Sequence, residues 1–403
     1  MSSVEGGARE IFYRDIPFMH WGIITRYNFD PSKAKYVPRK RWDPLSSSEI
    51  VLFDEATGKA IRIGKRRGHF SYISPVRGAR PGASGGKPPR DVFGEIAAGR
   101  DYAIFVTLDE IIESSVFSVK PVLRDVRRHK AVTIINRFPA MVRHIDPEIE
   151  GQVRELVENE FTKIAMGINL VTFPTKYAET LSDVDYESLK ALLKSMIASI
   201  RVAVNEAFKA RINIVPVYPF FNIGVMAGGS QPRLHSQVYI DLNKDGHGVF
   251  MENVLTAFAE HAKRGYCYLC TTSHEDRIVY ENSTWIVWAT LSPRRNFHLR
   301  LAPKRHVGRI TELDGYEVAG LADALIVVSK AMDLADIDRN RNILVYSNPY
   351  GYDSPFHVFV EVIPFERMGG IEVLDSCRVA RIAPEDTAKL LRETIEKNNI
   401  TST

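Results

Sequence analysis

The sequence predicts an α+β protein that contains one structural unit twice. Residues 101–245 and residues 246–395 each carry groups of strand-like apolar runs with a helix between them. In the first segment, apolar residues recur at helical spacing over residues 186–210, and Asp183 or Asp185 is a candidate for the helix cap. Two successive segments with a helix between strand groups favour a duplicated α+β unit.

The strand-like runs support this assignment along the whole chain. In the first segment they cover residues 102–108, 131–138, 168–173, 212–222 and 236–242. In the second they cover residues 277–282, 285–291, 297–303, 342–348 and 356–364. Further helices are predicted at residues 249–265, 316–334 and 384–398.

The first part of the chain does not follow this pattern. Residues 1–68 are polar, aromatic and irregular, with a hairpin-type turn at residues 54–58 between two short strand-like runs. Residues 74–90 are rich in glycine, proline and arginine, and a long loop of this kind is often functional. We therefore divide the chain into an N-terminal extension (1–68), a first domain (69–245) and a second domain (246–403).

Composition excludes several classes of protein. Of 403 residues, 45% are hydrophobic and 25% charged, as in an ordinary globular protein. No apolar run is long enough for a membrane span and no signal-peptide core is present, so we expect a cytoplasmic protein with no membrane partner. The net charge of +4 does not indicate nucleic acid but fits small anionic substrates. Three cysteines argue against a disulfide framework.

The run from Phe220 to Gln237, FFNIGVMAGGSQPRLHSQ, resembles the active-site segment of galactose-1-phosphate uridylyltransferases. That segment reads approximately F-x-N-x-G-x-x-x-G-x-S-x-P-H-P-H-x-Q. The runs SPVRGARP (74–81) and NRFPA (136–140) are similar to two further family segments, and the resemblance extends to about residue 395. It implies two tandem histidine-triad-like half-domains, each an antiparallel sheet with packed helices, and a homodimer with shared sites.

The resemblance implies that His235 is a nucleophile. A neutral imidazole can attack phosphorus and form a nucleotidyl-histidine, and a backbone carbonyl is expected to hold its other ring nitrogen. Ser230 and Gln237 are expected to donate hydrogen bonds to phosphate oxygens. We expect Gly228 and Gly229 to let backbone N–H groups approach the phosphate oxygens. Asn222 is expected to contact the phosphate or to order the glycine turn.

The first half lacks the zinc ligands that the family often has there. No cysteine precedes residue 267, Lys176 and Tyr177 stand where a histidine is expected, and Arg233 replaces the first histidine of the motif. Joint loss of these ligands indicates that the metal site was given up. Arg233 is then a structural replacement that pairs with a carboxylate or carbonyl, or alternatively a contact to substrate phosphate.

The second half has retained a candidate metal site. Cys267 and Cys270 have the spacing that lets two thiolates bind one ion, and His306 and His357 stand where related enzymes have two more ligands. Four such ligands make a closed, structural zinc site; the alternative is a pair of buried thiols. Phe359 stands where this half would carry a nucleophile, so zinc is expected here and chemistry only in the first half.

The resemblance also places substrate contacts. Two arginines on the glycine- and proline-rich loop suit a diphosphate, although a solvated basic loop is the alternative: Arg77 and Arg80. Three residues form the expected nucleoside wall: Asn136, Arg137 and Phe138. At the sugar end, Glu372 is the candidate for sugar hydroxyls or a surface carboxylate, and Arg378 stands near the position of a family glutamine. That arginine favours a more anionic acceptor or phosphate.

Three functions follow in order of preference. The first is a nucleotidyltransferase resembling UDP-glucose–hexose-1-phosphate uridylyltransferase, which moves a nucleoside monophosphate between sugar 1-phosphates and belongs to galactose and carbohydrate metabolism. The second is a phosphorylase of nucleotide sugars or dinucleoside polyphosphates that uses inorganic phosphate. The third is a non-catalytic nucleotide-binding protein. The sequence leaves the base, the sugar and the role of residues 1–68 open.

Overall fold

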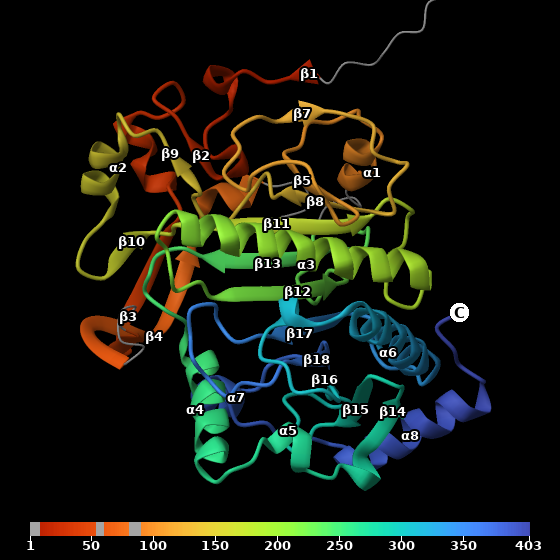
Figure 1. Ribbon diagram of the computed structural model, residues 1–403. Helices are drawn as coiled ribbons and strands as arrows, with labels where there is room; N and C mark the ends of the chain where they lie inside the picture. Colours follow the sequence, from red (N-terminus) through yellow and green to blue (C-terminus); the bar gives the residue numbers. More distant parts are fainter. Residues whose placement is uncertain (1–8, 54–59, 80–89) are drawn as a thin grey trace, which may run out of the picture.

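One antiparallel sheet of eleven strands forms the centre of the molecule (Figure 1). The structure is a computed structural model that describes residues 9–53, 60–79 and 90–403. Across the described part of this sheet the strand order is β14 (Ile278–Glu281), β15 (Trp285–Ala289), β16 (Leu299–Pro303), β18 (Phe359–Pro364), β17 (Arg341–Tyr346), β12 (Val217–Ile223), β13 (Ser236–Asp241), β11 (Gly167–Pro174), β8 (Ala131–Ile135), β5 (Phe105–Leu108) and β6 (Ile111–Ile112).

The two predicted segments meet in the middle of this sheet. β12 of the first segment pairs with β17 of the second, with Phe220 opposite Leu344. Strands from residues 105–241 therefore form one half of the sheet and strands from residues 278–364 the other. Each predicted run overlaps one of these strands, and the mixed α and antiparallel β character is as predicted. The division into two half-domains stays a prediction.

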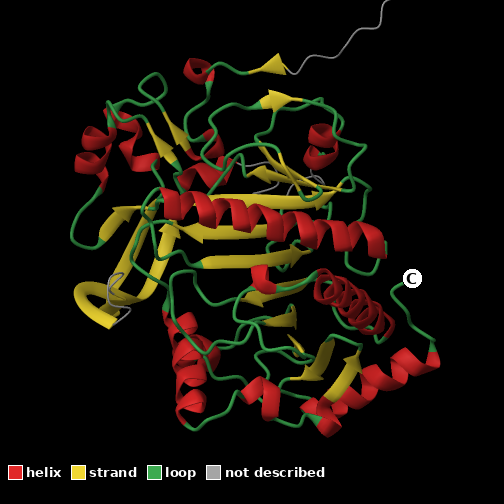
Figure 2. Cartoon of the chain, viewed as in Figure 1, coloured by secondary structure: helices red, strands yellow, loops and turns green. Residues whose placement is uncertain are grey.

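Alternating side chains divide the core between the two faces of the sheet. On one face, α3 (Tyr186–Lys209), α6 (Gly315–Leu334) and α8 (Pro384–Lys397) pack on a large apolar cluster. Figure 2 shows the helices in red beside the strands of the sheet in yellow. Smaller clusters lie under α1 (Val92–Ala97) and α4 (Val249–Lys263) on the opposite face. Because successive strand residues point to opposite faces, Val238 joins the α3 side while Gln237 points away from it.

The two long helices begin at aspartate caps. The Asp185 carboxylate accepts the N–H of Ser188 at 2.9 Å, which selects Asp185 over Asp183 as the cap of α3. At α6 the Asp314 carboxylate accepts the N–H of Glu317 at 2.8 Å, and the Glu317 carboxylate accepts the N–H of Asp314 at 2.9 Å. Each cap satisfies backbone donors that the first helical turn leaves without a partner.

The N-terminal extension forms a hairpin that packs against the end of β13. β3 (Arg39–Phe53) pairs with β4 (Ala60–Ile73), as the hairpin pattern predicts, and the turn at residues 54–58 lies outside the described residues. Lys40 Nζ lies 2.8 Å from the Asp241 carboxylate, and the Tyr72 hydroxyl donates to it at 2.6 Å. Both charged partners are 1% exposed, so the hairpin is tied to the sheet by a buried ion pair.

Short elements complete the fold. They are β1 (Arg9–Glu10), β2 (Ile23–Ile24), β7 (Val122–Leu123), β9 (His144–Ile145), α2 (Glu150–Val157), β10 (Thr162–Ile164), α5 (Tyr268–Thr271) and α7 (Gly370–Asp375). Of the helices in the described ranges, none has both the length and the apolar character that crossing a membrane requires.

Candidate active site and candidate metal centre

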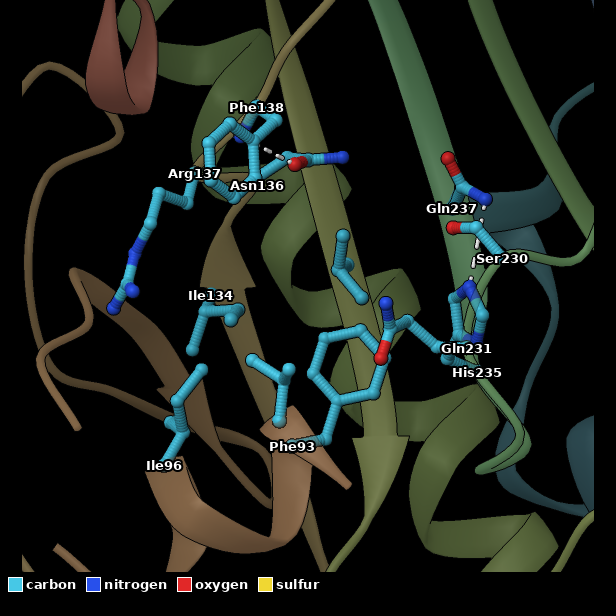
Figure 3. Close-up of a pocket in the computed structure, with 12 residues that line it drawn as sticks. Phe93, Ile96, Ile134, Asn136, Arg137, Phe138, Ser230, Gln231, His235 and Gln237 are labelled. Carbon is cyan, nitrogen blue, oxygen red and sulfur yellow. Dashed lines mark hydrogen bonds between the residues drawn. The ribbon is translucent and has the colours of Figure 1, made fainter. Parts of the chain in front are cut away.

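His235 lies immediately before β13, on the face of the sheet opposite α3, and is 5% exposed. Its Nδ1 lies 2.8 Å from the carbonyl oxygen of Arg233. A carbonyl oxygen can only accept, so Nδ1 carries the proton and Nε2 keeps its lone pair. Nε2 lies 3.5 Å from the side-chain amide nitrogen of Gln237 (Figure 3). The expected carbonyl contact is present, and it holds the ring in the tautomer that a nucleophile needs.

A largely apolar pocket opens beside this histidine (Figure 3). The Phe93 ring of α1 lies 5.0 Å from the His235 ring, between centroids, and stacks on Phe173 at 4.8 Å. Predicted site residues that line the pocket are Ser230, Gln237, Asn136, Arg137 and Phe138. Lining residues that the sequence did not predict are Val92, Phe93, Ile96, Ile134, Val171 and Gln231. The pocket therefore combines an apolar wall with a small number of polar side chains beside His235.

The predicted nucleoside wall is present, but its arginine has another partner. Asn136 Oδ1 accepts the N–H of Phe138 at 2.9 Å, and the Phe138 ring packs edge-on against His20 at 5.2 Å. The Arg137 guanidinium forms two hydrogen bonds to Asp101 and points away from His235 (Figure 3). The aliphatic part of the Arg137 side chain thus lines the pocket, while its guanidinium is neutralised by Asp101 away from His235.

The glycine loop before His235 uses its own backbone donors. The N–H of Gly228 is donated to Val225 O at 3.1 Å and that of Gly229 to Gly224 O at 2.9 Å. The expectation that these two N–H groups point at phosphate is therefore not met, because the turn consumes them. Gly228 has a φ of +87°, so its role here is to allow the turn. Asn222 orders the same loop, since its Oδ1 accepts from Asn342 Nδ2 at 2.8 Å.

Arg233 is held on both sides by the structure and is 5% exposed. Its Nε and Nη2 donate to the Asp91 carboxylate at 3.1 and 2.7 Å. Its Nη1 donates to the carbonyl oxygens of Pro174 and Thr175, each at 2.8 Å. Burial raises the pKa of Asp91, but the hydrogen bonds from Arg233 and from Gly94 N–H outweigh this and lower it overall. The structural alternative for Arg233, pairing with a carboxylate and carbonyls, matches these contacts.

The remaining predicted contacts lie apart from the pocket. Arg77 Nη1 donates to the Tyr239 hydroxyl at 2.9 Å, two residues beyond Gln237 on the same face of β13. Arg80 lies outside the described residues. Glu372 of α7 pairs with Arg295 and Arg378, and Arg378 also pairs with Glu366. Glu372 and Arg378 are not among the residues that line the pocket of His235.

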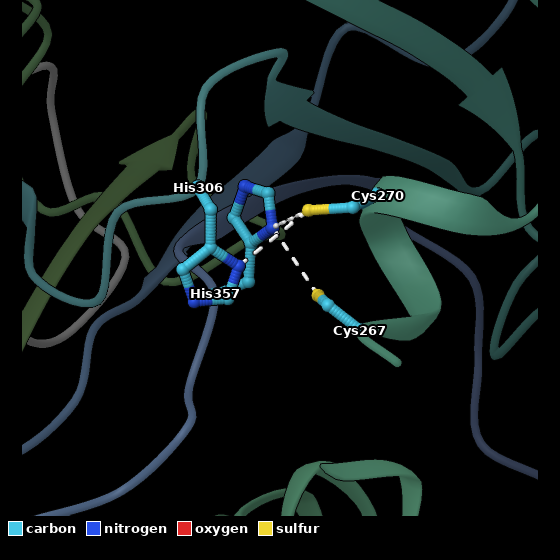
Figure 4. Close-up of side chains that lie close together, drawn as sticks. All are labelled: Cys267, Cys270, His306 and His357. Atoms are coloured by element: carbon cyan, nitrogen blue, oxygen red, sulfur yellow. Dashed lines mark hydrogen bonds between the residues drawn. The ribbon is translucent and has the colours of Figure 1, made fainter. Parts of the chain in front are cut away.

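In the second segment, the four predicted metal ligands converge (Figure 4). Their donor atoms all lie within 4.8 Å of one another. His357 Nδ1 lies 3.5 Å from the Cys267 sulfur and 3.4 Å from the Cys270 sulfur, and His306 Nδ1 lies 3.5 Å from the Cys270 sulfur. In a tetrahedral site with Zn–S near 2.3 Å and Zn–N near 2.0 Å, neighbouring donors stand roughly 3.3–3.8 Å apart. These residues fit a zinc ion, which would cross-link α5 to the sheet.

The ring of His357 is oriented for such a site. Its Nε2 lies 3.1 Å from the carbonyl oxygen of Pro303, so Nε2 carries the proton and Nδ1 presents its lone pair to the sulfurs. Burial, followed by the neighbouring His306, lowers the pKa of His357 to about 4, so the ring is neutral at pH 7. Burial and the adjacent Cys267 raise the pKa of the Cys270 thiol to about 11, a shift that a bound cation reverses.

Known proteins are similar to this chain in sequence, at low identity. No protein-family model matches the chain. It is 23% identical over 285 residues to an ADP-glucose phosphorylase from Arabidopsis thaliana, across 66% of this chain and 74% of that protein. It is 22% identical over 275 residues to a galactose-1-phosphate uridylyltransferase from Thermotoga maritima, across 65% of this chain and 84% of that one.

Solved structures agree with the sequence relatives. The structure of an Arabidopsis thaliana ADP-glucose phosphorylase with bound ADP-glucose has a TM-score of 0.59 at 19% identity, covering 86% of this chain and 99% of that one. A uridylyltransferase structure has a TM-score of 0.57 at 23% identity, covering 67% and 87%. The resemblance to the galactose-1-phosphate uridylyltransferases is confirmed. With that family's fold, the chain places the His235 pocket and the Cys/His cluster in opposite halves of one sheet.

Two features of the His235 pocket were missed from the sequence. One is α1, whose Phe93 and Ile96 form the apolar side of the pocket. The other is Asp91, which caps α1 through the N–H of Gly94 at 3.0 Å and also pairs with Arg233. A signal was available, because an aspartate before the run VFGEIA is typical of a helix start.

Proposed function

We propose that this chain transfers a nucleoside monophosphate from a nucleoside-diphosphate sugar to a phosphate acceptor through a covalent nucleotidyl-histidine at His235. One observation carries the proposal. The carbonyl of Arg233 holds the proton on Nδ1, which directs the Nε2 side of the ring to a pocket that also contains Ser230 and Gln237. The similarity to a uridylyltransferase and an ADP-glucose phosphorylase supports the same chemistry.

The proposed reaction has two displacements. In the first, His235 Nε2 attacks the α-phosphorus, the bond between that phosphorus and the bridging oxygen breaks, and sugar 1-phosphate leaves with the electron pair. The imidazolium then formed is stabilised by the Nδ1–H bond to Arg233 O. In the second, an acceptor phosphate oxygen attacks the same phosphorus and the P–N bond breaks, which restores the lone pair of Nε2. Gln237 and Ser230 stand beside the ring, where they can donate to the phosphate oxygens.

A second candidate differs only in the acceptor. Glu372, which in the first candidate would bind sugar hydroxyls, is neutralised by Arg295 and Arg378. Because the carboxylate is already paired, the two guanidinium groups beside it suit an anion better than a neutral sugar. This favours inorganic phosphate as the acceptor. The structural match to the ADP-glucose phosphorylase, which extends over 99% of that chain, supports this candidate.

We further propose the supporting architecture that the sequence indicated. The extension (1–68) precedes two tandem half-domains at residues 69–245 and 246–403, and two chains form a homodimer. A structural zinc ion is bound by Cys267, Cys270, His306 and His357, whose spacing and ring orientation fit it. Arg77 and Arg80 contact the diphosphate. The zinc serves only to stabilise the second half.

Mass spectrometry of the denatured protein tests the proposal. We expect an adduct of one nucleoside monophosphate at His235 after incubation with UDP-glucose or ADP-glucose, and none in His235→Ala. Galactose 1-phosphate and inorganic phosphate are then added separately, and the acceptor that discharges the adduct separates the two candidates. If no donor in a broad panel labels His235, the covalent mechanism is wrong and the non-catalytic alternative takes its place.

A further inference from the structure

A second pocket lies in the second half of the sheet, at the position that the His235 pocket has in the first half. In the first half, Gln237 of β13 stands opposite Val171 of β11, which stands opposite Ile134 of β8. All three residues line the His235 pocket. Residues directly opposite in neighbouring strands share one face of a sheet. This row therefore marks the floor of the first pocket.

The corresponding row in the second half has different chemistry. Glu361 of β18 stands opposite Arg300 of β16, which stands opposite Trp288 of β15. Phe359 precedes Glu361 by two residues, as His235 precedes Gln237. Arg300, Trp288 and Phe359 line a cavity of about 310 Å³, against about 80 Å³ for the pocket of His235. A cavity of this size is in the range of small-molecule sites.

The walls of this second pocket are aromatic. Trp288 stacks on His274 with ring centroids 4.1 Å apart and planes 6° apart. Tyr268, from α5, stacks on His261 of α4 at 5.4 Å. Aromatic and aliphatic walls with a small number of charged groups are typical of sites for planar ligands.

A buried arginine without a carboxylate partner gives the pocket its charge. Arg277 lines the cavity and is 7% exposed. Its Nη1 donates to Ala289 O at 3.0 Å, and its Nη2 lies 3.4 Å from His274 Nδ1. In the described ranges no carboxylate forms an ion pair with it. Burying a charge without a counter-charge is costly, so a guanidinium at a cavity wall indicates that an anion binds there.

Arg300 adds a second guanidinium to the same cavity. Its Nη2 donates to Glu361 at 2.6 Å, and its Nε is buried without a hydrogen-bond partner. Glu361 is also paired with Arg294, so a single carboxylate balances the charge of two guanidinium groups. Arg277 adds a third positive charge. Burial, then Arg277 and Arg300, lower the pKa of His274 to about 4, which agrees with a positive local field.

We propose that this second-half pocket binds a nucleoside monophosphate without reacting with it. The phosphate lies at Arg277 and Arg300, and the base lies against Trp288 and Phe359. No transfer occurs because Phe359 occupies the place that His235 has in the first half. The inference concerns a site other than His235 and does not depend on the reaction proposed there.

Equilibrium dialysis with AMP tests the site, since AMP has no leaving group with which to label His235. Ala257 is exposed on α4 at the rim of the cavity, and Ala257→Trp fills the opening without disturbing the core. Thr256→Trp, on the neighbouring exposed position that does not line the cavity, is the matched control. We expect Ala257→Trp to bind one AMP per chain fewer than the wild type and Thr256→Trp to bind the same number.

A charge variant gives a second measurement. Arg277→Gln is expected to weaken the affected AMP site by about tenfold or more, because hydrogen bonds to a charged group are lost. Thermal unfolding of the same variant confirms that it is folded. The proposal is wrong if Ala257→Trp and Arg277→Gln both bind AMP as the wild type does. It is also wrong if inorganic phosphate or adenosine alone occupies this site as tightly as AMP. If only the pocket of His235 failed to bind AMP, the wild type would bind fewer AMP molecules per chain, but the difference between the wild type and Ala257→Trp would remain.

Discussion

The two halves of the sheet have three corresponding positions, spaced two residues apart, that carry different residues in each half. Residues 233–237 supply an arginine, a nucleophile candidate and a glutamine, whereas residues 357–361 supply a metal-ligand candidate, a phenylalanine and a glutamate. In both halves a backbone carbonyl fixes one ring nitrogen of a histidine. Arg233 O holds Nδ1 of His235 and leaves Nε2 exposed to the pocket, while Pro303 O holds Nε2 of His357 and leaves Nδ1 for the sulfurs.

This difference shows that anchoring a strand and doing chemistry on it are separable tasks. In the first half the anchor is Arg233, tied to Asp91 and two carbonyl groups, and the residue two positions later is the nucleophile candidate His235. In the second half the anchor is the Cys/His cluster, and Phe359 two positions later packs on Tyr346 at 4.4 Å. Each half therefore has a candidate anchor, and only the first half has a nucleophile candidate.

Removing the nucleophile is expected to have the largest effect. In His235→Ala the lone pair that attacks phosphorus is gone, so we expect the rate of nucleotidyl transfer to fall by about 10⁴-fold or more with the fold intact. Single-turnover assays with a labelled nucleotide sugar measure the rate. His69→Ala, an exposed histidine on the hairpin, is the control and should keep wild-type activity. Wild-type transfer by His235→Ala would mean that the first half is not the reactive one.

Loss of the metal cluster is expected to destabilise the second half. Cys270→Ser should remove one zinc per chain, measured by elemental mass spectrometry, and lower the free energy of unfolding by several kcal/mol, because a structural zinc site contributes directly to folding. Cys377→Ser is the matched control, since Cys377 is exposed and lies outside the cluster. Equal zinc content in the wild type, Cys270→Ser and Cys377→Ser would show that the cluster does not bind zinc and does not anchor this half.

Breaking the anchor of the first half is expected to cost less. Asp91→Asn keeps the shape of the carboxyl group but removes its charge, and we expect a loss of about 2–3 kcal/mol because Arg233 is left buried without its counter-charge. The pKa of Asp91 is lowered in the folded protein, so its ionised form stabilises the fold above the unfolded pKa of 3.8. That contribution disappears as the pH falls below 3.8 through the folded pKa.

Urea unfolding at several pH values measures this effect. The difference in unfolding free energy between the wild type and Asp91→Asn should be constant from pH 5 to 7 and shrink below pH 3.8. A difference that persists undiminished at low pH would show that the Asp91 charge does not anchor Arg233. Transfer activity is a separate readout, since the carbonyl of Arg233 also positions His235.

The sequence indicated the candidate reactive groups of both halves, but not all of the residues that hold them in place. His235, Gln237 and the four metal ligands were found because reactive groups stand at fixed spacing along one strand or turn, and spacing is readable in a sequence. Arg233 as a replacement anchor followed from the joint absence of metal ligands. Its partner Asp91 did not, because that pair joins residues 142 positions apart and no local pattern records such a contact.

Two other features depend on contacts that a sequence does not display. The N–H groups of Gly228 and Gly229 were expected to face phosphate, but the positive φ of Gly228 closes a turn in which both are donated internally. Arg137 was expected in the nucleoside wall, and no local pattern indicated that its guanidinium pairs with Asp101 on the far side. Residue types showed which groups were present, while their partners depended on tertiary packing.

The smallest effects test whether the two halves unfold together. Asp185→Ala in α3 and Asp314→Ala in α6 each remove a carboxylate that accepts a first-turn N–H, and each should cost about 1 kcal/mol. Because β12 and β17 join the halves into one sheet, we expect both variants to shift a single urea transition by similar amounts. Tryptophan fluorescence, measured in a background in which Trp21 and Trp42 are replaced by phenylalanine so that it reports Trp285 and Trp288 in the second half, and far-ultraviolet circular dichroism follow the transition. If Asp185→Ala left the fluorescence transition unchanged while shifting the dichroism, the halves would unfold separately.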